Sequence, residues 1–342
     1  MHQIRRNVSC GLGANTPFRL LICMFVIGTT GLSAAQPASS PAAVASAITF
    51  ILPASEGGSA DRIGRIVAKA LARVLETPVE VKPIPGSWGI TGTNAIARAP
   101  RDGRTLGLGL STPMAGGKLL SRIAGYNPID SFDWLAIIGT YGNAMIVRQD
   151  HPAKSLLEWL ALARASPKPL RYGTGGTASA AHIAGEFLHV EQHANIVHVP
   201  FGVNAQAYAA LASGEIDVLF DGIPSARVAV DPSRFRILAV TSQKRDPRLP
   251  DAPAFGEIWR NQHFDLWAGI VAPNPLPPDQ RSRIVAAIGV MLADKSLVTE
   301  LQDAGINWLG LAGDGAGQFV RDDIVRKAKQ IGDLAIQPAS LP

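Results

Sequence analysis

A short apolar, β-rich run followed by a glycine loop and a helical segment occurs twice in this chain, and no other feature constrains the fold as strongly. Residues 48–52 lead through a polar glycine loop into 62–75, where apolar side chains recur at helical spacing. Residues 170–172 lead in the same way into an expected helix over 180–188. Alternating strands and helices build parallel sheets covered by helices. We therefore predict an α/β protein of two doubly wound α/β domains with a cleft between them.

The remaining segments divide between these two domains. Strands are expected at 79–81, 105–110, 196–201, 216–220 and 237–241, and helices at 94–98, 205–212, 279–292 and 316–331. The strand-like runs 144–148 and 267–272 flank the second unit, so we expect the chain to cross between the domains near them. Domain 1 is predicted to comprise residues 47–143 and 256–342, and domain 2 residues 144–255.

The N-terminus has the pattern of a secretory signal peptide. Its basic residues are arginines, an apolar run covers 20–32, and the small residues Ser33 and Ala35 precede a predicted cleavage site after Ala35. An uncleaved anchor is the alternative, but the run is shorter than the roughly 20 residues that span a membrane. We predict a signal peptide at 1–35 and, from its Pro, Ser and Ala content, a disordered tether at 36–46.

Removing the leader changes the composition. Cys10 and Cys23 both lie within it, so disulfides, thiol catalysis and cysteine-based zinc sites are excluded for the exported chain. Three arginines leave with it and no acids do, so Lys plus Arg falls from 32 to 29 against 27 acidic residues, and the formal net charge falls from +5 to +2. A chain so nearly neutral does not indicate nucleic acid as a partner.

Two glycine-rich loops lie between a strand and a helix, where open α/β sheets bind ligands. The first loop contains Glu56, Gly57, Gly58 and Ser59, and the second contains Thr174, Gly175, Gly176, Thr177 and Ala178. Both offer backbone N–H groups and small hydroxyls at a helix N-terminus, a combination that favours an anion. The alternative is that both are ordinary strand-to-helix turns with Ser or Thr caps.

Motifs for cofactors, metals and catalysis are incomplete. Residues 173–178 fit a dinucleotide-binding glycine pattern, but the next strand ends at Phe201 without the acid that would hold a ribose. Four histidines cluster between 182 and 198 without a carboxylate at metal-ligand spacing. A G-x-S-x-G nucleophile elbow and a convincing acid–base pair are both missing. We predict no cofactor, no metal and no catalytic residue.

Asp221 follows the apolar strand 216–220 and precedes Gly222, which places it at the carboxyl end of a strand. It is either a turn residue or a side chain that faces the cleft. In the cleft it would accept a hydrogen bond from a ligand hydroxyl or amine, or order a water. The residues alone leave both interpretations open.

Several separate blocks follow one another in the order of a known family. They are PGSWGITG at 85–92, RDGRTL at 101–106, YGTGGTASAAHIAGEF at 172–187, HVPF at 198–201, LASGEIDVLFD at 211–221, LAVTSQKR at 238–245 and LWAGIVAP at 266–273. With these blocks, the chain resembles the substrate-binding proteins of tripartite tricarboxylate transporters, the Bug family of Gram-negative bacteria. The resemblance extends from about residue 48 to about residue 310.

The resemblance implies a type II periplasmic-binding-protein fold, a location in the periplasm, and capture of a carboxylate-bearing solute without catalysis. It implies ligand contacts from both loops, from the end of the third strand and from Asp221. The candidate residues are Ala54, Glu56, Gly57, Gly58, Ser59, Asp61, Ser111, Thr112, Thr174, Gly175, Gly176, Thr177, Ala178 and Asp221. The expected partners are the membrane subunits of a transporter or a sensor receptor. The alternative functions are a ligand sensor that presents the bound solute to a membrane receptor and an enzyme on the same fold. A monomer is expected.

Departures from the family pattern concern the ligand. Glu56 stands where the family has proline, and an anion there repels a ligand carboxylate unless Arg62 or solvent compensates. Gly202 and Val203 follow HVPF where the family has Lys-Gly, so one expected cation is missing. These departures put the class of ligand in question more than the fold.

Overall fold

The computed structural model describes residues 47–121, 123–260 and 262–337. The predicted signal peptide and the predicted tether lie outside these residues. The described chain forms two β-sheets that belong to one compact unit. No helix among the described residues is long and apolar enough to cross a membrane.

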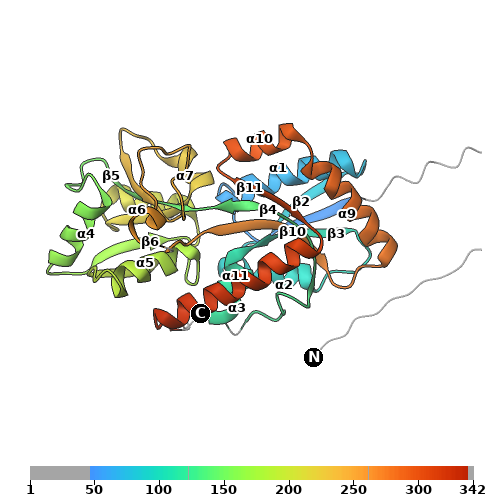
Figure 1. Cartoon of the computed structure of the whole chain (residues 1–342), viewed down its shortest axis with the longest axis horizontal. Helices are drawn as coiled ribbons and strands as arrows, with labels where there is room; N and C mark the ends of the chain where they lie inside the picture. The colour runs from blue at the N-terminus through green and yellow to red at the C-terminus, as the bar shows by residue number, and fades with distance from the viewer. Residues whose placement is uncertain (1–46, 122, 261, 338–342) are drawn as a thin grey trace, which may run out of the picture. The chain divides into compact units, whose positions relative to one another are not determined.

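The first sheet has six strands in the order β11-β4-β10-β3-β1-β2 (Figure 1). The strands are β1 (Ile48–Leu52), β2 (Val79–Pro83), β3 (Thr105–Leu110), β4 (Phe132–Tyr141), β10 (Leu266–Pro273) and β11 (Asn307–Ala312). β1 is parallel to β2 and β3, whereas β10 is antiparallel to β3 and β4, and β11 is antiparallel to β4. The carboxyl ends of β1 and β3 therefore meet at one edge of this sheet, where ligands of open α/β sheets bind.

Helices cover both faces of the first sheet. α1 (Ser59–Val74), α9 (Pro278–Leu292) and α10 (Lys295–Asp303) pack on one face, and α2 (Ile90–Ala97) and α11 (Asp314–Asp333) pack on the other. In α1, the fully buried side chains of Ile63, Val67 and Leu71 recur every four residues and form the stripe that meets the sheet. A short segment, 112–117, and α3 (Lys118–Leu120) follow β3.

The second sheet has five strands in the order β7-β6-β8-β5-β9. The strands are β5 (Asn143–Arg148), β6 (Leu170–Thr174), β7 (Ile196–Pro200), β8 (Val218–Gly222) and β9 (Phe235–Val240). β6 is parallel to β7 and β8, and β5 is antiparallel to β8 and β9. Again the parallel strands place their carboxyl ends at one edge.

The second sheet is also buried on both faces. α4 (Leu156–Ala165), α5 (Ala180–Val190) and α8 (Phe255–Ile258) pack on one face, and α6 (Asn204–Ser213) and α7 (Ile223–Ala229) on the other. Successive side chains of β5 point to opposite faces of the sheet. Met145 and Val147 pack with α4 and α5 on one face, and Ala144 and Ile146 pack with α6 and α7 on the other. A strand covered on both faces reads as a continuous apolar run, as this one does.

The chain passes between the sheets twice. Gly142 alone separates β4 of the first sheet from β5 of the second, and the return runs from the end of β9 to β10. The two crossings are hydrogen-bonded, with Thr241 N donating to Asn143 O at 2.9 Å and Asn143 N donating to Thr241 Oγ1 at 2.9 Å. The domain limits at 143/144 and 255/256 stay a prediction.

Candidate functional site

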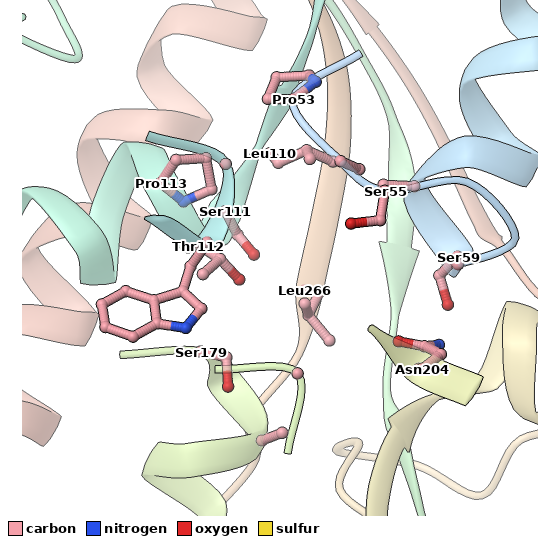
Figure 2. Close-up of a pocket in the computed structure, with 18 of the residues that line it drawn as sticks. Pro53, Ser55, Ser59, Leu110, Ser111, Thr112, Pro113, Ser179, Asn204 and Leu266 are labelled. Carbon is pink, nitrogen blue, oxygen red and sulfur yellow. The ribbon is translucent and has the colours of Figure 1, made fainter. Parts of the chain in front are cut away.

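A cavity of about 270 Å³ lies among loops of the two sheets. The first sheet contributes the loop after β1, the turn at 86–89 and the residues after β3. The second sheet contributes the loop after β6, the start of α6 and the end of β8. Figure 2 shows Ser55, Ser59, Ser111 and Thr112 with their hydroxyl groups around this space, and the side chain of Leu266 between them. Pockets for small molecules begin at about this size.

Eight of the fourteen candidate residues line the cavity: Ala54, Glu56, Gly58, Ser59, Ser111, Thr112, Gly175 and Asp221. The other six, which do not line it, are Gly57, Asp61, Thr174, Gly176, Thr177 and Ala178. Several of these six shape the loops instead of facing the space. A ligand-binding role for any of the fourteen stays a prediction.

The first loop is held by the buried carboxylate of Asp61. Asp61 Oδ2 accepts from Gly57 N at 3.1 Å, and Asp61 Oδ1 accepts from Arg65 Nε at 2.8 Å. Arg65 also pairs with Glu56 at 3.3 Å, and the Glu56 side chain is 75% exposed. The cation that compensates Glu56 is therefore Arg65 and not Arg62. An ion pair this exposed adds little stability, but it draws the Glu56 carboxylate toward the outer surface of α1.

Helix α1 begins at this loop without a side-chain cap. Gly58 occupies the N-cap position and has no side chain that could accept a hydrogen bond from the first N–H groups of the helix. The first N–H groups of a helix have no partner within the helix, and the helix dipole is positive at that end. Gly58, Ser59 and Ala60 all line the cavity, so these donors lie at its wall.

Ser111 follows β3 and is only 1% exposed. Its Oγ atom is buried and makes no hydrogen bond within the described structure. A buried hydroxyl without a partner is costly and is uncommon in folded proteins. Because Ser111 lines the cavity, a bound molecule can supply the missing partner.

Asp221 lies inside β8, one residue before its end, and not after the strand as the sequence suggested. Asn204 Nδ2 donates to its Oδ1 at 3.1 Å, and Tyr208 Oη and Ser225 Oγ donate to its Oδ2 at 3.0 and 2.5 Å. Burial raises the pKa of the Asp221 carboxyl, and the hydrogen bonds from Ser225, Tyr208 and Asn204 oppose this. The carboxylate of Asp221 thus accepts hydrogen bonds from three side chains of the protein, and Asp221 also lines the cavity.

The Asp221 network reaches the first loop. Ser59 Oγ lies 3.2 Å from Ser225 Oγ and accepts from Ser225 N at 3.1 Å. A Cβ atom on Gly222 would lie 2.5 Å from Ser59 Oγ, so the start of α1 closely approaches the end of β8. Ser59 and Ser225 therefore connect the start of α1 with α7 at one side of the cavity.

Two histidines support the second loop from behind. His182 Nδ1 accepts from Ala178 N at 3.2 Å, and His198 Nε2 lies 2.7 Å from Thr174 Oγ1. Their rings stack with centroids 4.2 Å apart. Loss of hydration lowers the pKa of His182, and the same effect, with the nearby His182, lowers the pKa of His198 to about 3. Both rings are therefore neutral at neutral pH.

Several cavity residues were not predicted from the sequence. Trp88, Tyr141, Asn143, Asn204 and Leu266 line the cavity with the predicted residues. Trp88 lies in the PGSWGITG block, which matched the family pattern but was taken only as a turn. Asn204 follows the HVPF block, where only a missing lysine was noted. Tyr141 and Asn143 flank the first crossing, and its position depends on strand pairing that no local pattern reveals.

The described residues hold no group of three or more His, Cys, Asp or Glu side chains arranged to bind a metal ion. The charged residues that line the cavity are Glu56 and Asp221. Its other polar side chains carry hydroxyl groups, amide groups and the indole N–H of Trp88. Such a cavity can hold a small molecule by hydrogen bonds and apolar contact.

Comparison with known proteins gives the family. The profile of the family described as "Tripartite tricarboxylate transporter family receptor" matches residues 63–336. The chain belongs to this family. A relative from Pseudomonas sp. (strain P51), "UPF0065 protein in tcbD-tcbE intergenic region", is 28% identical over 286 residues, which are 83% of this chain and 85% of the relative. The predicted resemblance is confirmed.

Solved structures give the fold of this family member. The periplasmic binding protein BugD is 23% identical, with a TM-score of 0.78 over 85% of this chain and 98% of BugD. The R. palustris protein Rpa4515, solved with adipate, is 24% identical, with a TM-score of 0.79 over 86% of this chain and 99% of Rpa4515. The predicted periplasmic-binding-protein fold is confirmed.

Proposed function

We propose that this family member is a periplasmic solute-binding protein that captures a small carboxylate and delivers it to the membrane subunits of a tripartite tricarboxylate-type transporter. Membership of the receptor family supports the transport role. Adipate in the structure of Rpa4515 supports a carboxylate as the ligand. In this proposal the protein performs no catalysis, and the segment 1–35 directs its export.

The buried hydroxyl of Ser111 carries the proposal. It is nearly inaccessible to solvent, has no hydrogen-bond partner in the described structure and lines the cavity. The uncapped start of α1 and the loop residue Gly175 border the same cavity with backbone N–H groups. Neutral donors at a helix N-terminus are well suited to a carboxylate. We assign the ligand contacts to the eight candidate residues that line the cavity.

Thermal unfolding against a panel of carboxylates, amino acids and neutral analogues tests the proposal. A ligand at 100 times its dissociation constant adds about 2.7 kcal/mol to the free energy of unfolding. We expect a rise in melting temperature with a subset of carboxylates. Ser111→Ala should keep the melting temperature of the free protein, because the hydroxyl has no protein partner, and should bind the same carboxylate about tenfold more weakly.

Ser233→Ala, at an exposed serine, is the matched control and should bind like the wild type. Shifts with amines or neutral compounds alone would contradict the carboxylate assignment. If no compound gives a shift, native mass spectrometry of the purified protein shows whether a molecule already occupies the cavity. A ligand-free protein that responds to no carboxylate would overturn the proposal.

A further inference from the structure

The turn at 86–89 has an unusual backbone. Its four residues all have positive φ, at 122° for Gly86, 46° for Ser87, 54° for Trp88 and 91° for Gly89. Glycine adopts this conformation readily, but a bulky side chain such as that of Trp88 does so rarely and at a cost. Strain of this kind collects at ligand sites, where the surrounding structure maintains it. Trp88 is therefore a residue whose position calls for a functional explanation.

The indole of Trp88 lies against the second loop. A Cβ atom on Gly176 would lie 1.6 Å from Trp88 Cδ1 and 2.1 Å from Trp88 Nε1, so the ring rests directly on the Gly176 backbone. Gly176 also has a φ of 141°, which other residues rarely adopt. Trp88 comes from a turn of the first sheet and Gly176 from a loop of the second. The indole thus bridges two of the segments that surround the cavity.

Trp88 is part of an apolar surface within the cavity. The other apolar members are Pro53, Leu110, Pro113, Phe220 and Leu266. Figure 2 shows Leu266 between the hydroxyls of Ser111 and Thr112 and those of Ser55 and Ser59, with Leu110 above them. An indole offers a large flat face on which a planar ligand can stack. The cavity therefore combines polar donors with a surface suited to a flat apolar body.

Charge in the cavity limits how many anionic groups a ligand can carry. No Lys, Arg or His is found among the described residues that line it, and both of the charged residues, Glu56 and Asp221, are acidic. Neutral donors such as Ser111 and the start of α1 can hold one carboxylate. Glu56 is paired with Arg65 and largely exposed, so the uncompensated charge at the cavity is that of Asp221. A second carboxylate would find no cation among the lining residues and would be repelled by Asp221.

We propose that the ligand is a flat monocarboxylate and that Trp88 is the residue that selects it. This inference rests on the proposed function, since it specifies which carboxylate the same cavity takes. The neutral donors hold the carboxylate, and the indole packs against the planar body. Asp221, with no cation among the lining residues, disfavours di- and tricarboxylates.

Isothermal titration of protein expressed from the full chain tests this with benzoate, adipate and citrate as probes. We expect benzoate to bind about tenfold more tightly than adipate or citrate, the size of effect that ring stacking provides. Trp88→Gly suits the left-handed turn, so this variant should fold and keep its melting temperature. Its affinity for benzoate should fall about tenfold, and the preference for benzoate over adipate should fall by a similar factor to the part that charge alone provides.

Trp88→Phe retains a flat ring and should keep the preference for benzoate over adipate. Phe would have to adopt the same left-handed backbone conformation as Trp88. The ratio of the benzoate and adipate affinities is the decisive quantity, because general damage to the cavity would weaken both. Tighter binding of adipate or citrate than of benzoate would overturn this inference and leave the proposed function standing. An unchanged ratio in Trp88→Gly would remove Trp88 as the selecting residue. Failure of all three carboxylates to bind, with the carboxylate panel also negative, would overturn both proposals.

Discussion

At the scale of single residues, Asp221 is the centre of a hydrogen-bond network within the protein. Its carboxylate accepts from Asn204, Tyr208 and Ser225, so its removal leaves three donors without their acceptor. Each buried donor left unpaired costs roughly 1–3 kcal/mol. We expect Asp221→Ala to lower the free energy of unfolding by about 2 kcal/mol or more, as measured by urea denaturation. Ligand affinity should fall as well, because Asn204 borders the cavity.

Asp221→Asn separates the effect of the hydrogen bonds to Asp221 from the effect of its charge. The amide oxygen retains an acceptor for the network but carries no charge, so this variant should be more stable than Asp221→Ala. If Asp221 repels second carboxylates, Asp221→Asn should also bind adipate more tightly than the wild type does. Equal stability of the wild type and Asp221→Ala would show that the three hydrogen bonds contribute nothing to the fold.

At the scale of elements, the second loop depends on neutral histidines. In an unfolded chain a histidine has a pKa near 6.5, whereas in this structure the pKa of His198 is lowered to about 3. Between these values the unfolded chain takes up a proton that the folded protein excludes. The contribution of the neutral His198 ring to the free energy of unfolding is therefore complete above pH 6.5 and is lost as the pH falls toward 3. Between pH 6.5 and 5 we expect a loss of about 2 kcal/mol from His198.

Urea denaturation at a series of pH values measures this loss. His198→Gln should flatten the decline below pH 6.5, because glutamine can still bond Thr174 but does not titrate. His193→Gln, at an exposed histidine on the same segment, is the matched control. A decline as steep in His198→Gln as in the wild type would assign the acid sensitivity to other groups.

Most strands could be predicted from the sequence, but which strands pair with one another could not. β1 and β3 were predicted at 48–52 and 105–110, and the structure has the same limits. β4 and β11 had no predicted counterpart, whereas β5 and β10, which also pair antiparallel with distant strands, were expected at 144–148 and 267–272. The glycine loops were found because their residue types are informative. Trp88 and Asn204 were missed because only the fold brings the turn at 86–89 and the start of α6 to the cavity.

At the scale of the whole molecule, the two crossings determine how the sheets are coupled. Gly142 and Ser242 are neighbours there, since a Cβ atom on Gly142 would lie 3.1 Å from Ser242 Cβ. Thr241, which is fully buried, accepts from Asn143 N at 2.9 Å and donates to Phe264 O at 3.1 Å. One hydroxyl thus connects the start of β5 with the segment that leads into β10. These bonds lie where the chain crosses between the two sheets.

Thr241→Val keeps the shape of the side chain but removes its hydroxyl. The N–H group of Asn143 and the carbonyl of Phe264 then lose a partner, so we expect the free energy of unfolding to fall by about 2–4 kcal/mol in urea denaturation. Thr241→Ser retains the hydroxyl and should lose less. Because the sheets share two bonded crossings, the wild type should unfold in one transition by fluorescence and by circular dichroism alike. Two separate transitions in the wild type would mean that the sheets unfold independently and that the bonds of Thr241 do not couple them.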